Sequence, residues 1–134
     1  MKNRILAFIT VVLLISCFCT TYAGEMESVY RASDVINDCG ISTSGNGSKL
    51  TATAQIRGTE PCDKIGFKYI FIQELRDGKW VTIASDYDVY SYNTSTKRAS
   101  LSCTKESGKQ YRAVATGYAL LDGVSDTAWC SSEH

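Results

Sequence analysis

Short runs of alternating apolar and polar residues, separated by clusters of Gly, Asn, Asp and Ser, constrain this chain more than any other feature. They recur roughly every 8 to 15 residues, helical periodicity is almost absent, and such spacing is typical of all-β domains. The clearest run places Leu50, Ala52, Ala54 and Ile56 in alternation with polar residues. Because successive strand residues point to opposite faces, this run predicts a half-buried strand.

Seven segments of this kind are separated by turn residues. We expect strands at 35–43, 50–57, 64–75, 80–84, 98–104, 110–119 and 124–131. Asp77-Gly78, between the third and fourth segments, is a strong hairpin signal because both residue types tolerate the positive φ of a tight turn. The strands do not alternate with helices. The pattern therefore predicts an all-β chain folded as a seven-stranded antiparallel β-sandwich.

Three segments carry further expectations about the sandwich. Tyr69-Ile70-Phe71-Ile72 is apolar on both strand faces, which suits a central strand covered above and below. The polar, tyrosine-rich stretch 85–96 is expected to form a crossing between the sheets. Ser33 is in position to cap a short helix over 34–38, which is the alternative to an early start of the first strand.

The first 23 residues have the three-part layout of a secretory signal peptide. Lys2 and Arg4 supply a positive start, an apolar run covers 5–15, and small residues lead to Ala23. The apolar run is too short for a comfortable membrane span, which needs about 20 residues. We therefore expect a secreted protein whose mature form begins at Gly24 and has no transmembrane span.

A second processing site lies within the same segment. Leu14-Ile15-Ser16-Cys17 resembles the lipobox of bacterial lipoproteins, in which the cysteine is lipidated. That alternative anchors the protein at the cell surface through Cys17 and favours a structural role in the envelope. The expected organisation is a signal peptide, a flexible segment, one sandwich domain and a C-terminal tail, with the boundaries 1–23, 24–33, 34–131 and 132–134.

The charge of the mature chain is close to neutral. Of the 14 basic side chains, Lys2 and Arg4 lie in the signal, so 12 remain against 14 acidic ones. Nucleic-acid binding depends on Lys and Arg contacts with phosphates, so no nucleic-acid partner is expected. No cofactor is expected either.

Four cysteines remain after the signal, namely Cys39, Cys62, Cys103 and Cys130. An even number of cysteines in an exported chain favours disulfides. A zinc site is not expected, because the four are far apart in sequence and His134 is the single histidine. If successive strands alternate in direction, two cysteines fall near each end of the sandwich. Because a disulfide needs Cα atoms within about 7 Å, we predict the pairs Cys39–Cys62 and Cys103–Cys130.

No familiar catalytic arrangement is evident in the sequence. His134 stands at the end of the chain, where residues are usually mobile, so nucleophile–histidine pairs are not expected. Glu74, Asp86 and Asp88 are acidic groups that a small secreted hydrolase could use, because glycoside hydrolysis needs two carboxylates. Asp86 and Asp88 also have oxygens that suit calcium, but the rest of a calcium loop is missing, so a solvated acidic turn is preferred.

The aromatic residues indicate a binding function. Trp80, Tyr87, Tyr90 and Tyr92 lie close together in sequence. Tyr and Trp offer large, stiff faces with one polar group, and they recur at interfaces and on sugar-stacking surfaces. We expect Trp80 at the core or its edge and the tyrosines in an exposed patch, with ordinary loop packing as the alternative. The leading hypothesis is a non-catalytic extracellular module in which these four residues bind a protein or a carbohydrate.

The stretch SGKQYRAV at 107–114 leads from a turn into a tyrosine and then an alternating strand. It resembles the penultimate strand of fibronectin type III and related immunoglobulin-like domains. In those domains the tyrosine hydroxyl ties the preceding corner to the backbone. The resemblance implies that role for Tyr111 and an immunoglobulin or fibronectin type III-like sandwich.

A second resemblance covers most of the mature chain. The motifs that carry it are RASD at 31–34, DKIG at 63–66, Trp80 and GKQY at 108–111. They resemble a family of small exported proteins of unknown function from Gram-positive bacteria. This implies a bacterial origin and transfers no catalytic residue. Members of that family mostly lack cysteines at the four positions, so the cysteines are additions to the fold.

Overall fold

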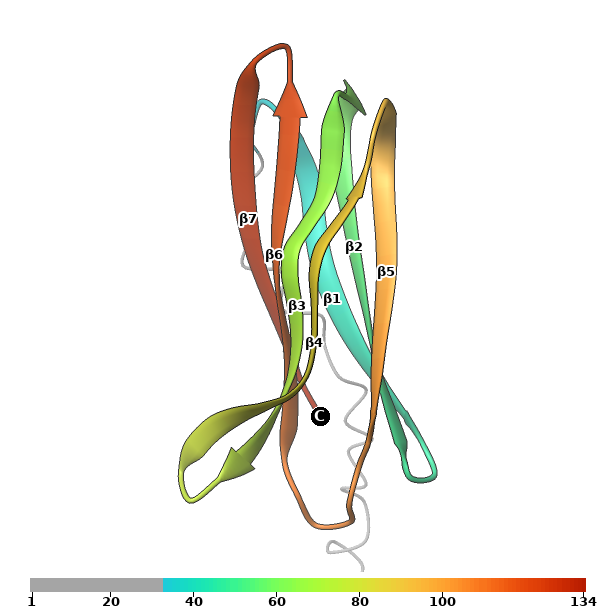
Figure 1. Cartoon of the computed structure of the whole chain (residues 1–134), viewed down its shortest axis with the longest axis vertical. Coiled ribbons are helices and arrows are strands. Elements are labelled where there is room, and N and C mark those ends of the chain that lie inside the picture. The colour runs from blue at the N-terminus through green and yellow to red at the C-terminus, as the bar shows by residue number, and fades with distance from the viewer. Residues whose placement is uncertain (1–32) are drawn as a thin grey trace, which may run out of the picture.

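A computed structural model describes residues 33–134 of the chain, and seven strands account for most of them. The strands are β1 (Ile36–Asn46), β2 (Lys49–Cys62), β3 (Lys64–Arg76), β4 (Lys79–Ser91), β5 (Thr94–Thr104), β6 (Tyr111–Leu121) and β7 (Val124–Glu133). They form two antiparallel sheets that pack face to face, with the orders β1-β2-β5 and β4-β3-β6-β7 (Figure 1). The predicted all-β, seven-stranded antiparallel β-sandwich is confirmed.

The predicted signal peptide and the alternative lipidation site at Cys17 lie outside the described residues. Within residues 33–134, no helix is long and apolar enough to pass through a bilayer.

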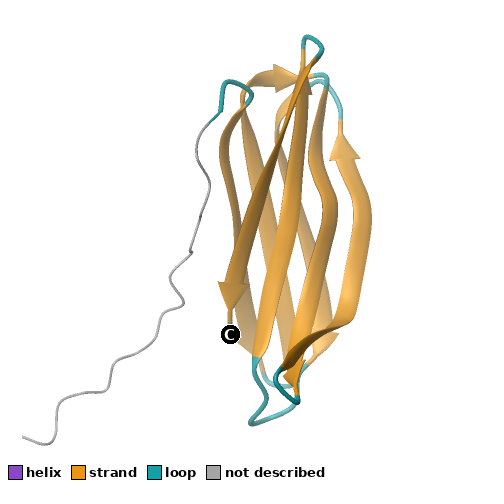
Figure 2. Ribbon diagram, turned by 90° about the vertical axis from the view of Figure 1, so that its left-hand side faces the viewer, coloured by secondary structure: helices purple, strands orange, loops and turns teal. Residues whose placement is uncertain are grey.

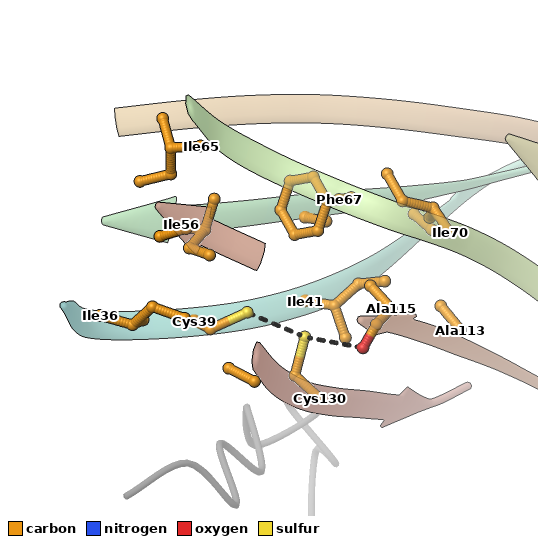
Figure 3. Close-up of a cluster of buried hydrophobic side chains, with 14 of the residues drawn as sticks. Ile36, Cys39, Ile41, Ile56, Ile65, Phe67, Ile70, Ala113, Ala115 and Cys130 are labelled. Atoms are coloured by element: carbon orange, nitrogen blue, oxygen red, sulfur yellow. Dashed lines mark hydrogen bonds between the residues drawn. The ribbon is translucent and has the colours of Figure 1, made fainter. Parts of the chain in front are cut away.

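The core lies between the two sheets and is built from the inward-facing positions of their strands (Figure 3). On β2, Leu50, Ala52, Ala54 and Ile56 are all fully buried, as their alternation predicts. From the other sheet, Phe67 of β3 is fully buried in the same cluster. Burying a large aliphatic or aromatic side chain stabilises a fold by about 1.5–3 kcal/mol, so this alternation holds the sheets together.

Two tight hairpins join neighbouring strands within the four-stranded sheet. Asp77 and Gly78 have φ of 50° and 75° between β3 and β4, and Asp122 and Gly123 have φ of 49° and 80° between β6 and β7. Positive φ at both central residues is the geometry that matches the twist of the flanking strands. The hairpin predicted from Asp77-Gly78 is therefore confirmed. These turns gather with the other loops at the two ends of the sandwich (Figure 2).

Tyr111 holds the connection that leads from β5 to β6, and thus from one sheet to the other. Its side chain is buried, and its hydroxyl oxygen accepts a hydrogen bond of 2.8 Å from the backbone N–H of Glu106. The hydroxyl therefore ties the preceding corner to the backbone, which is the role that the resemblance to fibronectin-like domains implied.

Most strands extend beyond their expected limits, and two of these extensions change the expected organisation. β4 continues to Ser91, so much of the stretch expected to cross between the sheets is strand, and the crossing is confined to Tyr92 and Asn93. β7 continues to Glu133, and the backbone of His134 also pairs with β6. Polar side chains do not interrupt a strand, because the ladder hydrogen bonds come from the backbone. The sandwich thus includes positions assigned from sequence to a C-terminal tail.

The beginning of the described chain is a turn followed directly by β1. The Ser33 hydroxyl oxygen accepts hydrogen bonds from the backbone N–H groups of Val35 and Ile36, at 3.2 and 2.8 Å. β1 begins at Ile36, so the short helix considered over 34–38 does not form.

The four cysteines of the described chain do not pair as predicted. All four are free thiols, and the close pair is Cys39 of β1 with Cys130 of β7, whose sulfurs lie 3.7 Å apart (Figure 3). Cys62 and Cys103 lie at opposite ends of the β2–β5 pair. The prediction was wrong because it placed Cys130 at the end of the seventh strand. β7 continues beyond Cys130, so this thiol lies inside the core and not at one end of the sandwich.

Candidate binding surface

The outer face of the four-stranded sheet carries a row of aromatic side chains across its strands. In the ladder, Tyr69 of β3 lies between Tyr87 of β4 and Thr116 of β6, and Thr116 lies opposite Trp129 of β7. The rings at the two edges are open to solvent, with Tyr87 59% and Trp129 46% exposed. The row therefore runs from one edge of the sheet to the other.

Phe71 widens this row along β3. Its ring stacks on Tyr69 with 4.6 Å between centroids and meets Tyr87 edge-on at 5.4 Å. Ile70 and Ile72, which alternate with these rings, are fully buried in the core. β3 is therefore covered by the other sheet on one face only. The prediction of a strand covered above and below is wrong, because the rings of β3 form part of the molecular surface.

Two further tyrosines form a second row. Tyr90 of β4 and Tyr118 of β6 lie opposite Gly66 of β3, one on each side, and their rings meet edge-on at 6.0 Å. The Lys64 ammonium lies 3.9 Å from the centre of the Tyr90 ring, and that of Lys68 lies 5.2 Å from the centre of the Tyr118 ring. A cation–π contact stabilises by about 0.5–1 kcal/mol at an exposed site, so these lysines help to order the rings.

Trp80 belongs to the same face and not to the core. The Arg112 guanidinium lies 4.5 Å from the centre of the Trp80 ring. Arg112 Nε donates a hydrogen bond of 2.7 Å to the Gln73 side-chain oxygen, and the Gln73 amide nitrogen donates one of 3.1 Å to the Thr82 hydroxyl. This polar chain holds the guanidinium over the ring, so Trp80 and Arg112 form an ordered pair.

A register irregularity brings Tyr87 and Tyr90 to the same face. Residues three apart in a regular strand point to opposite faces. Asp88, between them, is left-handed with φ of 54°, and Lys68 on β3 is the extra residue where the β3–β6 register slips. A bulge of this kind re-aims side chains, and here it leaves Val89 inward with both tyrosines outward. Burial, and then the charge of Asp88, raises the pKa of the Tyr90 hydroxyl.

We call this surface the aromatic face. Its rings and cations are Tyr69, Phe71, Trp80, Tyr87, Tyr90, Tyr118 and Trp129 with Lys64, Lys68 and Arg112. Of the four predicted binding residues, Trp80, Tyr87 and Tyr90 lie on it. Tyr92 does not, because it lies in the crossing between β4 and β5, where it is 64% exposed.

Sequence reasoning missed four rings of the aromatic face, namely Tyr69, Phe71, Tyr118 and Trp129. Tyr69 and Phe71 were assigned to burial because isoleucines alternate with them. The alternation of aromatic and aliphatic residues along the strand is the sequence feature from which they could have been predicted. Aliphatic side chains suit a dry core, whereas Tyr and Trp suit a surface that is apolar at one end and wet at the other.

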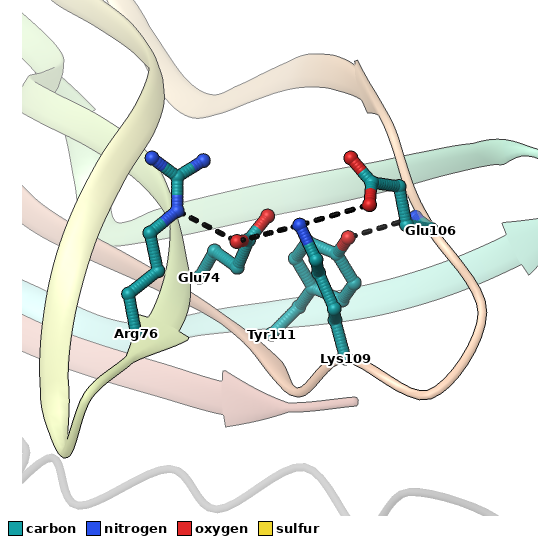
Figure 4. A network of polar contacts seen from close by, with 5 residues as sticks. All are labelled: Glu74, Arg76, Glu106, Lys109 and Tyr111. Carbon is teal, nitrogen blue, oxygen red and sulfur yellow. Dashed lines mark hydrogen bonds and ion pairs between the residues drawn. The ribbon is translucent and has the colours of Figure 1, made fainter.

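Glu74 and Asp86, two of the carboxylates considered for hydrolysis, are not brought together. Glu74 is 3% exposed and is held by Arg76 Nε at 2.7 Å and Lys109 Nζ at 3.2 Å, which lower its pKa (Figure 4). Asp86 lies opposite Ile70, four residues along β3 from Glu74, so about 13 Å separates the two positions. Paired glycosidase carboxylates lie roughly 5–9.5 Å apart. Glu74 is an ion-paired structural group here.

His134 is held in place by its neighbours. Its backbone N–H and C=O pair with those of Tyr111, and its Nε2 lies 3.2 Å from Lys105 Nζ. Burial, and then the charge of Lys105, lowers the pKa of the imidazole. These residues line a hollow of about 530 Å³ at the end of the sandwich. Across residues 33–134, no three His, Cys, Asp or Glu side chains are grouped as metal ligands.

Comparison with known proteins adds little to this geometry. Neither a protein-family model nor a curated protein sequence matches the chain. A solved structure described as "pT26-6p" is similar to it with a TM-score of 0.48 and 17% sequence identity over 72% of this chain. The present chain spans only 21% of that protein. A likeness of this degree carries no functional argument, so function must be argued from the aromatic face.

Proposed function

We propose that this protein is a secreted, non-catalytic binding module that contacts a partner protein through the aromatic face. The observation that carries the proposal is the aromatic face, which has rings on all four strands and whose most exposed rings, Tyr87 and Trp129, lie at the two edges. Contiguous exposed apolar surface on a folded domain marks an interaction site more often than chance.

The composition of the aromatic face suits recognition of a protein surface. Trp, Tyr and Arg are the residues most enriched among those that dominate binding energy. Stacking and cation–π contacts already order Tyr69, Phe71, Tyr90 and Trp80, so little side-chain freedom is lost on binding. The aromatic face is therefore preorganised for binding.

The size of the aromatic face favours a modest contact. Four strands about 4.8 Å apart, read over the ten residues of β3 from Gly66 to Leu75, give a surface of roughly 600 Å². A standard stable interface buries about 800 Å² on each partner. We therefore infer that the module binds its partner weakly or transiently, or that several copies of the module together bind it tightly.

The remaining parts of the proposal rest on the sequence and on the strand order. The fourth strand joins the sheet of β3, β6 and β7, which supports an immunoglobulin or fibronectin type III-like classification. The predicted signal peptide supports secretion, and the resemblance to exported proteins of Gram-positive bacteria supports a bacterial source. Lipidation at Cys17 is the alternative that keeps the module at the cell surface. The separation of Glu74 from Asp86 supports a role without catalysis.

The proposal can be tested by capturing the partner with matched variants. Immobilised wild-type protein and Tyr92→Ala, which removes an exposed tyrosine outside the aromatic face, should retain the same protein from the culture medium of the source organism. Tyr87→Ala combined with Trp129→Ala should bind it at least roughly thirty-fold more weakly, because interface rings contribute about 2 kcal/mol or more. The melting temperatures should stay within a few degrees of each other.

Two outcomes would change the conclusion. Equal retention by the double variant would remove the aromatic face as the contact surface. Binding to insoluble chitin, cellulose or peptidoglycan with the same dependence on Tyr87 and Trp129 would keep the face and assign it a carbohydrate in place of a protein.

A further inference from the structure

Cys39 and Cys130 form a thiol pair that bridges the two sheets. Cys39 lies on β1 in the three-stranded sheet, and Cys130 lies on β7 in the four-stranded sheet. Their sulfurs are 3.7 Å apart, and both residues are fully buried (Figure 3). No ladder joins β1 to β7, so the contact between these sulfurs crosses the core.

The neighbour of β7 in the four-stranded sheet, β6, leaves space for the sulfurs. Gly117 of β6 faces inward, and a Cβ at this position would lie 2.9 Å from Cys39 Sγ and 2.7 Å from Ile56 Cδ1. Any larger residue would push the Cys39 sulfur away. On the other side, the Cys130 thiol donates to the backbone oxygen of Ala115 at 3.8 Å. The site therefore holds both sulfurs side by side.

We propose that Cys39 and Cys130 oxidise to an intersheet disulfide that links β1 to β7. The sulfurs need to close from 3.7 Å to the bond length of about 2.05 Å, a movement within reach of small side-chain rotations. Cys62 and Cys103 stay reduced, because they lie at opposite ends of the β2–β5 pair. The Cys62 thiol instead donates to the backbone oxygen of Glu60 at 3.4 Å.

The oxidant is a small-molecule disulfide or a thiol–disulfide oxidoreductase. One cysteine thiolate attacks an oxidant sulfur, forming a mixed disulfide and expelling the other oxidant sulfur as a thiol. The second cysteine then attacks the mixed disulfide, forms the Cys39–Cys130 bond and expels the second thiol. The two cysteines lose two protons and two electrons, and the oxidant is reduced to two thiols.

The contact between the thiols favours ionisation, and their burial determines how the oxidant reaches them. The hydrogen bond between the two sulfurs lowers the pKa of Cys39, and a lower pKa increases the thiolate fraction that can attack an oxidant. Both thiols are buried, and the oxidant reaches them during folding or when β7 opens. β7 is an edge strand, and edge elements open at lower cost than central ones.

The bond should stabilise the fold strongly. It would join residues 91 positions apart, and cross-links that close long loops restrict the unfolded chain most. For a domain of this size we expect the melting temperature to rise by roughly 10 °C or more. If the chain is secreted as proposed, it meets the oxidising conditions in which such bonds persist.

Peptide mapping of the wild-type full chain tests the pairing directly. The protein is reduced, refolded with reduced and oxidised glutathione, alkylated and digested with trypsin without reductant. The four cysteines fall on separate tryptic peptides, 32–49, 58–64, 99–105 and 113–134. The expected product joins 32–49 to 113–134, with Cys62 and Cys103 alkylated. A link between 32–49 and 58–64, or alkylation of all four cysteines, would overturn the proposal.

Melting temperatures of matched variants test the consequence. Wild type and Cys62→Ala/Cys103→Ala should both lose roughly 10 °C when reductant is added. Cys39→Ala/Cys130→Ala should show no response to reductant. If the melting temperature of the wild type does not change when reductant is added, the proposed stabilising role of the Cys39–Cys130 disulfide is wrong. The peptide map needs no variant, so it decides the pairing even if a variant fails to fold.

Discussion

The two outer faces of the sandwich follow the same pattern and carry opposite chemistry. On the three-stranded sheet, the hydroxyls of Thr51 and Ser102 lie 2.9 Å apart, and those of Thr53 and Ser100 lie 3.1 Å apart, across β2 and β5. We call this surface the hydroxyl face. On the four-stranded sheet, the outward positions carry the rings and cations of the aromatic face. On both faces the outward side chains alternate with buried residues. Folding of the sheet therefore does not require aromatic residues at its outward positions.

The difference between the two faces shows that outward-facing aromatic side chains are not required for this fold. Hydroxyl side chains that bond to each other across strands satisfy a solvated sheet and offer little apolar area to other molecules. Half-exposed rings such as Trp129 gain less from folding than buried ones, and they remain available to a partner. The hydroxyl face therefore offers little apolar area, whereas the aromatic face leaves large rings exposed.

The largest effect should come from the core that both faces share. Phe67→Ala removes a fully buried ring and should lower the free energy of unfolding by about 3–5 kcal/mol. Phe71→Ala, on the same strand but on the aromatic face, should cost about 1 kcal/mol. Chemical denaturation measures both. Equal losses would show that the rings of the aromatic face are core residues.

A second substitution should damage one face and spare the other. A Cβ at Gly66 would collide with the carbonyl oxygen of Val89, so Gly66→Ala should shift the β3–β4 pairing and cost about 1–3 kcal/mol. Gly47→Ala, in the β1–β2 turn, meets nothing within 4 Å and should cost about 1 kcal/mol for its φ of 57°. Near-UV circular dichroism should change only for Gly66→Ala, because the tyrosines beside it would move. An unchanged spectrum and stability would contradict the packing described at Gly66.

The inward side of β3 adds a response to acid that belongs to neither outer face. Glu74, which is buried near the end of β3, has a pKa held below its ordinary 4.5 by Arg76 and Lys109. Its ion pairs therefore stabilise the fold above about pH 4.5, and this contribution is lost as the pH falls through the lowered pKa. The difference in unfolding free energy between wild type and Glu74→Gln should shrink below pH 4.5.

Denaturation of both proteins between about pH 3 and about pH 7, a range chosen to bracket the ordinary glutamate pKa of 4.5, measures this effect. Glu60→Gln, at an exposed glutamate of β2, is the matched control and should follow wild type. A constant difference between wild type and Glu74→Gln across this range would mean that the ion pairs do not stabilise the carboxylate.

The smallest effects should come from the hydroxyl face. Thr53→Ala and Ser100→Ala each remove the same exposed hydrogen bond, which joins these two hydroxyls. Either substitution should lower the free energy of unfolding by about 0.5 kcal/mol or less. Neither should alter partner binding, in contrast to Tyr87→Ala. Binding losses of similar size on both faces would contradict the proposal that the partner contacts the aromatic face alone.

Local rules were enough to predict the core and the hairpins from sequence. The alternation of Leu50, Ala52, Ala54 and Ile56 and the Asp77-Gly78 turn each depend on neighbouring residues alone, and both are confirmed. The role of Tyr111 came from a short motif whose geometry is also local.

Features that depend on how distant strands align could not be predicted in the same way. The contact of Cys39 with Cys130 requires knowing where β1 and β7 lie across the core, and the sequence shows neither. The row from Tyr87 to Trp129 needs the register of four strands. The shared orientation of Tyr87 and Tyr90 depends on a bulge that breaks the alternation used to predict faces.

Lys68 is the extra residue of β3, and the left-handed Asp88 lies beside it in β4. Together they couple the lengths of the two strands. β6 has no counterpart of Lys68, yet it presents Thr116 and Tyr118 outward by plain alternation. Deleting Lys68 or Asp88 alone would leave the other without a neighbour, whereas deleting both would restore a regular ladder with the same rings outward. Insertions and deletions at this point should therefore be inherited in pairs, so the aromatic face tolerates substitution more readily than a change in the length of one strand.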